Sequence, residues 1–307
     1  MRTSEFIIIL LLLSAIAIGG YFIWLNLPAE PLEYVPFVAN ITQDTAPEEI
    51  LAEQFYNNMR FPSADISYSI SDSCADYKKE SVERAFSIIS EKTIIRFFPS
   101  STSPEIIVSC SDSPPEKEDS GHFIAGEGGP TEIINTSRFN VILSGKVALY
   151  REESCDEPKI AIHEILHVLG FNHSSDSNSI MYPITGCSQK IDSAILDEIN
   201  SLYSISSFAD LGIESVNATK KGSYLDFRAE VMNYGLKDSA DSTLIVFSGD
   251  KKAGEFELGE IGIGMKKILT VENSRIARGS TQVSFLIESN ETELFKQNNI
   301  AELNLAV

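Results

Sequence analysis

Residues 163–173 read HEILHVLGFNH, and this stretch decides the fold. It contains the pattern HExxHxxGxxH, in which His163 and His167 lie four residues apart and therefore share one face of a helix. Two imidazoles placed in this way bind one zinc ion at about 2.0–2.1 Å. Glu164 stands beside them and reaches the open side of the metal, where it acts as a general base.

A glycine and a third histidine complete the pattern. Gly170 can adopt φ > 0, so it ends the helix and turns the chain, and His173 returns as the third ligand. Three protein ligands leave a fourth position for water, which is the arrangement of a catalytic zinc site. Three of the chain's four histidines occupy the three ligand positions, which argues against coincidence. A decayed site that binds metal without catalysis is the alternative.

The residues that follow point to a family. Met181 stands eight positions after His173, and the extended window over residues 163–183 reads HEILHVLGFNHSSDSNSIMYP. This window resembles the metzincin zinc peptidases and, within them, the matrixins. The resemblance implies an α+β catalytic domain over residues 60–205, with a twisted mixed sheet and three helices. It also implies that Met181 forms an apolar base beneath the zinc and that Pro183 begins a wall of the S1′ pocket.

Several features depart from the matrixin pattern. Ile165 and Leu166 stand where the family often has a glycine-containing pair, and no PRCG-like cysteine switch precedes the domain. A second, structural zinc needs further histidines, and only His122 remains, which we interpret as a plain loop residue. Calcium sites are common in the family and carboxylates are plentiful, but no D-x-[DN]-x-[DN]-G loop occurs. Calcium therefore stays an alternative second cofactor, for which the sequence contains no binding motif.

The N-terminus predicts export. Residues 6–27 are uncharged and mostly apolar, which is long enough to span a bilayer. The positive charge lies before this stretch, in residues 1–5, so these residues form a cytoplasmic tip and the rest of the chain lies outside the cell. A cleaved signal peptide, with Ala15-Ile16-Ala17 as the cleavage site, is the alternative. Residues 28–59 are expected to form a stalk and a short helix that begins at Ala46.

The four cysteines are expected to form two disulfides because exported chains meet an oxidising compartment. No C-x-x-C pair occurs, and four cysteines allow three pairings that sequence alone does not distinguish. We favour Cys155–Cys187, which would join the segment before the zinc helix to the segment after Met181. We then pair Cys74 with Cys110, because both stand at the ends of predicted strands.

Periodicity predicts the remaining elements of the catalytic domain. Alternation and apolar runs indicate strands, and apolar residues at helical spacing indicate helices. A glycine-rich stretch at residues 121–130 is interpreted as a loop. The strands are expected at residues 66–70, 93–98, 105–110 and 141–150, and the helices at residues 78–90, after Pro158, and at residues 193–203.

After Phe208 the pattern changes to seven short strand-like runs separated by turn residues, which is typical of an Ig-like β-sandwich over residues 207–307. The runs at residues 210–213, 231–235 and 298–305 resemble the CARDB adhesion domains of prokaryotic surface proteins. The pattern is equally compatible with other sandwich families. A spacer or an accessory binding domain for a surface ligand is the expected role.

Composition restricts the partners. The 307 residues carry 44 Asp and Glu against 24 Lys and Arg, a net charge of -20, which excludes a nucleic-acid backbone as partner. The sequence therefore predicts an extracellular, membrane-anchored zinc endopeptidase that acts on protein or peptide substrates. The alternative is a surface adhesion or binding protein that uses the metzincin domain as a scaffold. The acidic surface favours basic or neutral substrates over acidic ones.

Overall fold

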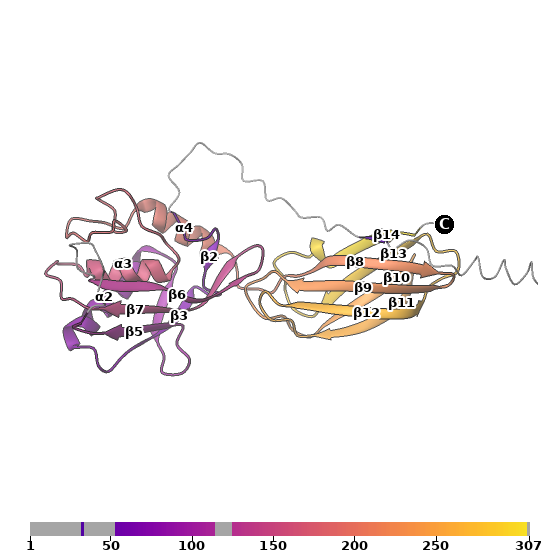
Figure 1. The fold of residues 1–307 in the computed structure, drawn as a ribbon, viewed down its shortest axis with the longest axis horizontal. Coiled ribbons are helices and arrows are strands. Elements are labelled where there is room, and N and C mark those ends of the chain that lie inside the picture. Colours follow the sequence, from indigo (N-terminus) through magenta and orange to yellow (C-terminus); the bar gives the residue numbers. More distant parts are fainter. Residues whose placement is uncertain (1–31, 34–52, 114–124, 306–307) are drawn as a thin grey trace, which may run out of the picture. The chain divides into compact units, whose positions relative to one another are not determined.

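The computed structural model describes residues 32–33, 53–113 and 125–305 (Figure 1). These residues form two compact units. The first contains residues 53–113, 125–209 and 234–237, and the second contains residues 32–33, 210–233 and 238–305. The predicted anchor at residues 6–27, most of the predicted stalk, and His122 lie outside the described residues. Within the described part of the chain, no helix is long and apolar enough to cross a membrane.

The first unit contains a mixed sheet in the order β2-β7-β5-β3-β4, with β6 on the other side of β7. All neighbours pair in parallel except β6, which is antiparallel to β7 and forms one edge of the sheet. The strands are β2 (Met59–Arg60), β3 (Asp65–Ile70), β4 (Arg96–Pro99), β5 (Ile106–Cys110), β6 (Gly126–Asn135) and β7 (Asn140–Leu149).

Helices α2 (Asp76–Lys92), α3 (Lys159–Val168) and α4 (Ser193–Ser204) complete the first unit. On α2, Val82, Phe86 and Ile89 share one buried face because they recur at helical spacing. All ten residues of α3 are buried. This unit is therefore a mixed sheet with helices packed on it, the α+β arrangement that the sequence predicts (Figure 1).

Two expectations for the first unit are wrong. The predicted glycine-rich loop is in part a strand, since β6 begins at Gly126. The predicted helix up to Met59 is absent from its described part, residues 53–59, where the Phe55 N–H instead donates to the Gly170 carbonyl at 2.9 Å. The Gln54 side chain also accepts a hydrogen bond from the Met59 N–H at 2.9 Å, which holds this segment in a turn.

The cysteines pair as Cys74–Cys110 and Cys155–Cys187, the same pairs that the sequence analysis favours. The first links the start of the α2 segment to the end of β5. The second joins the segment before α3 to the chain that follows Met181. Disulfides of this kind indicate an oxidising compartment.

The second unit is a two-sheet β-sandwich, as the seven predicted strands require. One sheet has the order β1-β8-β9-β12 and the other the order β11-β10-β13-β14, and all pairs are antiparallel. Phe227 and Phe285, from different sheets, meet with ring centroids 5.1 Å apart in the core. The strands are β1 (Leu32–Glu33), β8 (Leu211–Lys221), β9 (Tyr224–Asn233), β10 (Ser242–Ser248), β11 (Lys251–Gly259), β12 (Lys266–Arg275), β13 (Gln282–Ser289) and β14 (Ile300–Asn304).

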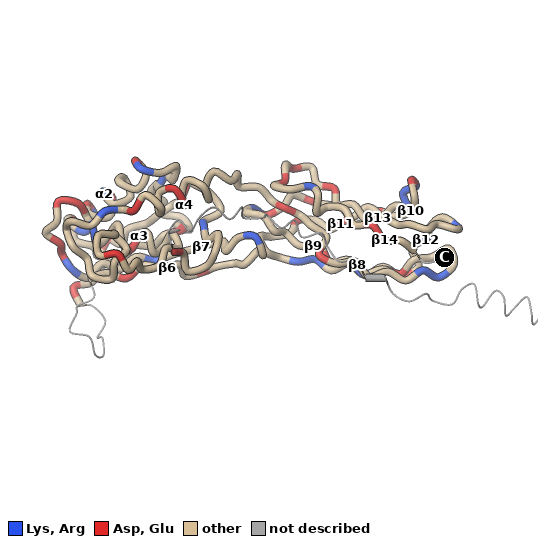
Figure 2. Tube along the Cα trace, turned by 90° about the horizontal axis from the view of Figure 1, so that it is seen from above, with Lys and Arg blue, Asp and Glu red and all other residues tan. Residues whose placement is uncertain are grey.

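The charged residues of both units lie along the surface strands, loops and helices, with acidic positions more frequent than basic ones (Figure 2). Most of the ion pairs join exposed or half-exposed side chains, such as Arg96 with Asp65 at 2.6 Å. Such pairs contribute about 0–1 kcal/mol each. The cores of the two units therefore depend mainly on apolar packing.

Candidate metal centre

Helix α3 carries His163, Glu164 and His167, and its C-terminus turns the chain toward His173. The Phe171 N–H donates to the Leu166 carbonyl at 3.1 Å and the Gly170 N–H to the His167 carbonyl at 3.0 Å. This pair of bonds is a Schellman motif, which requires a left-handed residue after the helix. Gly170 supplies it with φ 97°. A Cβ at this position would also lie 2.8 Å from the Met59 side chain, so glycine is required on two grounds.

Backbone carbonyls fix the protonation of two imidazoles. His163 Nδ1 lies 2.6 Å from the Ile180 carbonyl oxygen, and His167 Nδ1 lies 2.7 Å from the Phe171 carbonyl oxygen. A carbonyl only accepts, so each Nδ1 carries the proton and each Nε2 keeps its lone pair. Burial lowers the pKa of His163, and it lowers the pKa of His167 to about 4, which keeps both rings neutral.

The three imidazoles converge through their Nε2 atoms. His167 Nε2 lies 3.0 Å from His163 Nε2 and 3.1 Å from His173 Nε2. Nitrogen ligands at 2.0–2.1 Å around a tetrahedral zinc ion lie about 3.3–3.4 Å apart, close to these separations. The unprotonated lone pairs of His163 and His167 face each other without a shared proton, which is favourable only with a cation between them. The neutral imidazoles of His163 and His167, together with His173 Nε2 as the third nitrogen, therefore form a donor set that fits zinc.

The position of His173 depends on the turn that contains Met181. The N–H of Ser174, the next residue, donates to the Met181 carbonyl at 2.9 Å, and the Met181 N–H donates to Ser179 Oγ at 3.0 Å. Met181 is 1% exposed. Pro183 follows in an exposed bend. The turn thus places an apolar, rigid segment next to the third histidine.

Strand β6 lies directly against Glu164. A Cβ at Gly126 would lie 2.8 Å from Glu164 Cγ and Oε1, and a Cβ at Gly128 would lie 2.1 Å from the Glu164 carbonyl oxygen. The two glycines therefore allow this close approach of β6 to α3. Glu164 is 6% exposed, and burial, with a smaller contribution from the charge of Glu127, raises its pKa to about 8. A positive charge nearby would lower this pKa again.

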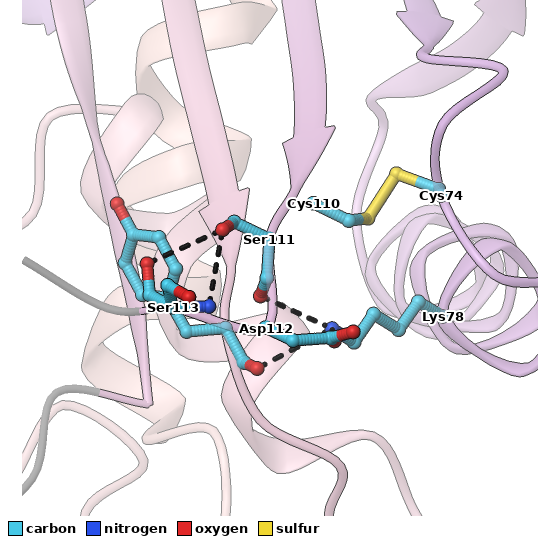
Figure 3. A network of polar contacts seen from close by, with 7 residues as sticks. Cys74, Lys78, Cys110, Ser111, Asp112 and Ser113 are labelled. Carbon is cyan, nitrogen blue, oxygen red and sulfur yellow. Dashed lines mark hydrogen bonds and ion pairs between the residues drawn. A yellow bond between two sulfur atoms is a disulfide. The ribbon is translucent and has the colours of Figure 1, made fainter.

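A polar network holds the end of the sheet that borders this site. The buried Lys78 ammonium donates to the carbonyls of Ser111 and Tyr150, at 3.2 and 3.3 Å, and pairs with Asp112 at 2.8 Å (Figure 3). It thus ties α2 to the chain after β5 and to the chain after β7. The Tyr150 hydroxyl donates to Glu127 Oε2 at 2.9 Å, which fixes the second residue of β6.

Two further features border the centre. The Phe55 ring stacks on His167, with centroids 5.8 Å apart and planes inclined by 23°. A cavity of about 680 Å³ opens beside His173 and Met181, and its other walls include Asp192–Ser193 and Glu198 at the N-terminal half of α4. The site therefore has one aromatic ring stacked on His167 and a pocket large enough for a side chain.

The structure brings the predicted site residues together and adds others that the sequence did not indicate. His163, His167 and His173 form one cluster with Glu164 in the same helix, and Met181 and Gly170 shape the turns around them. Sequence reasoning missed Phe55, Glu127 and Tyr150. Only the Gly126-Glu-Gly128 spacing carried a signal, since glycines at alternate positions of a strand permit another backbone to approach one face.

A mixed sheet with an antiparallel edge strand beside a helix that carries an HExxH pair defines the zinc-dependent metallopeptidases as a class. Residues 60–204 match the family model of the matrixins. The match confirms the resemblance of this part of the chain to the matrixins that is noted in the sequence. The family implies zinc and a protein or peptide substrate.

Other comparisons concern relatives and solved structures. None of the curated proteins matches the chain. Among solved structures, the CARDB domain of a protein from Pyrococcus furiosus, solved in complex with di-metal ions, is similar to part of the chain. The identity is 17%, the match covers 32% of this chain and 88% of that chain, and the TM-score is 0.28.

Proposed function

We propose that residues 60–205 form a zinc-dependent endopeptidase that acts outside the cell, attached to the membrane through residues 6–27. The observation that carries the proposal is the convergence of the Nε2 atoms of His163, His167 and His173 beside the buried carboxyl of Glu164. The two disulfides support an exported location. The apolar residues 6–27 supply the anchor, or a signal peptide if they are cleaved.

Each residue has a role that follows from its position. Zinc held by the three Nε2 atoms would lower the pKa of a bound water to about 7 and polarise a peptide carbonyl. Glu164 accepts the proton of the attacking water on its carboxylate and delivers it to the leaving amine. The Ile180 and Phe171 carbonyls hold the rings of His163 and His167 in the ligating tautomer.

The substrate is proposed to bind along β6. This strand is an edge of the sheet, and its outer backbone groups can pair with an extended peptide. The cavity beside His173 and Met181 lies next to the centre and would accept the side chain that follows the scissile bond. Its lining includes Asp192 and Glu198, which agrees with the preference for basic or neutral substrates inferred from the net charge.

Cleavage of a random peptide library by the full chain tests the proposal. We expect cleavage that a chelator abolishes and that added zinc restores, and the cleaved products report the preferred side chain after the scissile bond. A surface binding protein that uses this domain as a scaffold is the second candidate. It would bind zinc without cleaving any peptide, and that result would reject the endopeptidase. A buried Glu164 beside the histidines favours the enzyme, because a scaffold needs no general base.

The second unit is proposed to act as a spacer or an accessory binding domain. Its two antiparallel sheets form a core of their own. Disruption of this core by Phe285→Ala would leave cleavage of small peptides intact under this proposal and would change only the binding to larger substrates or surfaces.

A further inference from the structure

Glu127, the second residue of β6, lies on the face of this edge strand that points away from α3. Gly126 and Gly128, on either side of it, face Glu164, since a Cβ added at either position would contact that residue. Successive side chains of a strand point to opposite faces, so the Glu127 side chain points to the other face, where it is half-buried. The carboxyl groups of Glu127 and Glu164 therefore lie on opposite sides of the β6 backbone.

A tyrosine holds the Glu127 carboxylate in place. The Tyr150 hydroxyl donates to Glu127 Oε2 at 2.9 Å, and the Tyr150 N–H donates to the Ala125 carbonyl at 2.9 Å, next to the start of β6. The Tyr150 carbonyl in turn accepts a hydrogen bond from the buried Lys78 ammonium at 3.3 Å. A carboxylate held in this way loses little conformational freedom when it binds a cation.

The charge of Glu127 has no cation partner within the described residues. The Tyr150 hydroxyl bonds to one of its two oxygens, and none of the ion pairs in this part of the chain includes Glu127. Lys146 lies opposite Gly129, two residues further along β6, where it is exposed. The charge of Glu127 also contributes to the raised pKa of Glu164, so it acts at the edge of the metal centre.

The outer edge of β6 can present this charge to an extended peptide. Within the described part of the chain, β6 pairs only with β7, so its other backbone groups are available to an added strand. Directly opposite residues of an antiparallel pair point to the same face, with Cβ atoms about 4.5–5.5 Å apart. The substrate residue opposite Glu127 would therefore point away from α3 with it, whereas its two neighbours would point toward α3.

We propose that Glu127 is a specificity-determining residue, which selects Lys or Arg at the substrate position opposite it on β6. The inference rests on the proposed peptidase function and adds a substrate position to the one that enters the cavity beside His173 and Met181. An ammonium or guanidinium group at this position would pair with the positioned carboxylate. An acidic side chain there would be repelled by the like charge, which makes the selection stronger.

The experiment uses the full chain loaded with zinc. A peptide library first locates the positions at which the wild type prefers Lys or Arg. Three peptides that differ only at the position opposite Glu127, with lysine, norleucine or glutamate, are then compared by kcat/KM. Lysine and norleucine have side chains of four carbons, so the ratio of their kcat/KM values reports the effect of the charge. Within one variant the catalytic step is shared, so an effect of Glu127 on Glu164 cancels in this ratio.

Two substitutions change the charge at position 127. Glu127→Gln removes the charge and keeps both the shape and an oxygen that can accept the Tyr150 hydroxyl. Glu127→Lys reverses the charge. Glu83→Gln, at an exposed position of α2, is the matched control, because it removes an equal charge away from β6.

We expect the wild type and Glu83→Gln to cleave the lysine peptide about three- to tenfold more efficiently than the norleucine peptide. The difference should lie mainly in KM and should decrease at high salt, because a half-buried ion pair is partly screened. Glu127→Gln should lower the ratio to about one, and Glu127→Lys should favour the glutamate peptide. The preference for the side chain that enters the cavity should be the same in all variants.

An unchanged ratio in Glu127→Gln would overturn the inference, and so would a library in which the wild type prefers a basic side chain only at the position that enters the cavity. Peptides are cleaved in both of these cases, so the proposed peptidase would stand. If the zinc-loaded wild type cleaves no peptide, the proposed function fails and the inference fails with it. If Glu127→Lys does not fold, Glu127→Gln decides alone.

Discussion

Glu164 distinguishes a peptidase from a metal-binding scaffold. Its side chain does not belong to the three-imidazole ligand set, so Glu164→Ala should leave zinc stoichiometry unchanged. Loss of the proposed proton acceptor should lower kcat by a factor of about 10²–10⁴. The measurement is kcat on a cleaved peptide together with zinc content by mass spectrometry. Glu83→Ala, at an exposed position of helix α2, is the matched control and should retain full activity. Undiminished turnover by the Glu164 variant would reject its role.

The same residue should determine how the stability of the zinc-free protein depends on pH. The pKa of Glu164 is raised to about 8 from 4.5, so its proton is bound more tightly in the folded state. Stability from this group therefore increases as the pH falls from about 8 toward 4.5. The pKa of His167 is lowered to about 4 from 6.5, so the unfolded state takes up that proton first. Stability from this group decreases as the pH falls below 6.5.

These opposite effects predict that zinc-free wild type gains stability as the pH falls from about 8 to 6.5, and that below pH 6.5 the lowered pKa values of His163 and His167 oppose this gain. Glu164→Gln removes the gain and keeps the loss. Urea denaturation of both chelated proteins between pH 4 and 8.5 measures the two curves. If the curves have the same shape, the raised pKa of Glu164 is wrong. With zinc present, protonation of the ligands in acid should release the metal as well.

The ligands could be predicted from the sequence because their spacing alone places them. His163 and His167 share a helix face at any i, i+4 spacing, and Gly170 permits the turn that returns His173. The carbonyl partners could not be predicted. His163 Nδ1 donates a hydrogen bond to the Ile180 carbonyl, 17 residues further along the chain. Because every residue has a backbone carbonyl, no residue type in the sequence indicates this contact. Phe55 was missed for a similar reason, because its stacking depends on the chain pairing with Gly170.

At the scale of elements, the contact between β6 and α3 determines the geometry of the site. Gly128→Ala would place a Cβ 2.1 Å from the Glu164 carbonyl oxygen, so the strand must move away from the helix. We expect a loss of about 1–3 kcal/mol in the free energy of unfolding, together with a lower kcat. Gly129→Ala is the matched control, because its Cβ would have no atom within 4 Å. Denaturant unfolding compares the two variants, and equal stabilities would contradict the close approach.

The disulfide between Cys155 and Cys187 connects two elements of the site. It closes a chain segment with a sequence separation of 32, for which loop entropy predicts a stabilisation of about 3–4 kcal/mol. Replacement of both cysteines by alanine should therefore lower stability by this amount and also weaken zinc binding, because α3 and the Met181 turn are no longer joined. Replacement of Cys74 and Cys110, with a separation of 36, should lower stability by a similar amount with less effect on zinc affinity. Equal zinc affinities for the two double variants would contradict this division.

Elements with strong periodicity could be predicted, and elements whose chain path depends on tertiary contacts could not. Every one of the seven predicted strands of the second unit is found, because alternation of apolar and polar residues marks a half-buried strand. Residues 126–130 of β6 fall within the predicted loop because the glycines of this segment, which the contact with Glu164 requires, carry no alternation. The segment before Met59 has a composition typical of a helix, but the Phe55 N–H donates to the Gly170 carbonyl instead of to a carbonyl of its own segment. The Gln54 side chain also accepts the Met59 N–H and so holds the segment in a turn.

At the scale of the whole molecule, the chain consists of two compact units with separate hydrophobic cores. The matrixin match covers residues 60–204, within the first unit. The sequence predicts that residues 60–205 and residues 207–307 are separate domains, and their independent folding stays a prediction. Two separate cores predict two unfolding transitions, each sensitive to ligands of its own unit.

Chelation of zinc from the full chain tests this division. Zinc present at 100 times its dissociation constant stabilises the unit that binds it by about 2.7 kcal/mol, so a chelator should lower one calorimetric transition and leave the other unchanged. Gly128→Ala marks the first unit and should lower the same transition as the chelator does. Phe285→Ala, in the core of the second unit, marks that unit and should lower only the other transition. A single transition that all three changes shift together would show that the two cores unfold as one, and the second unit would then be part of the folding unit of the zinc centre.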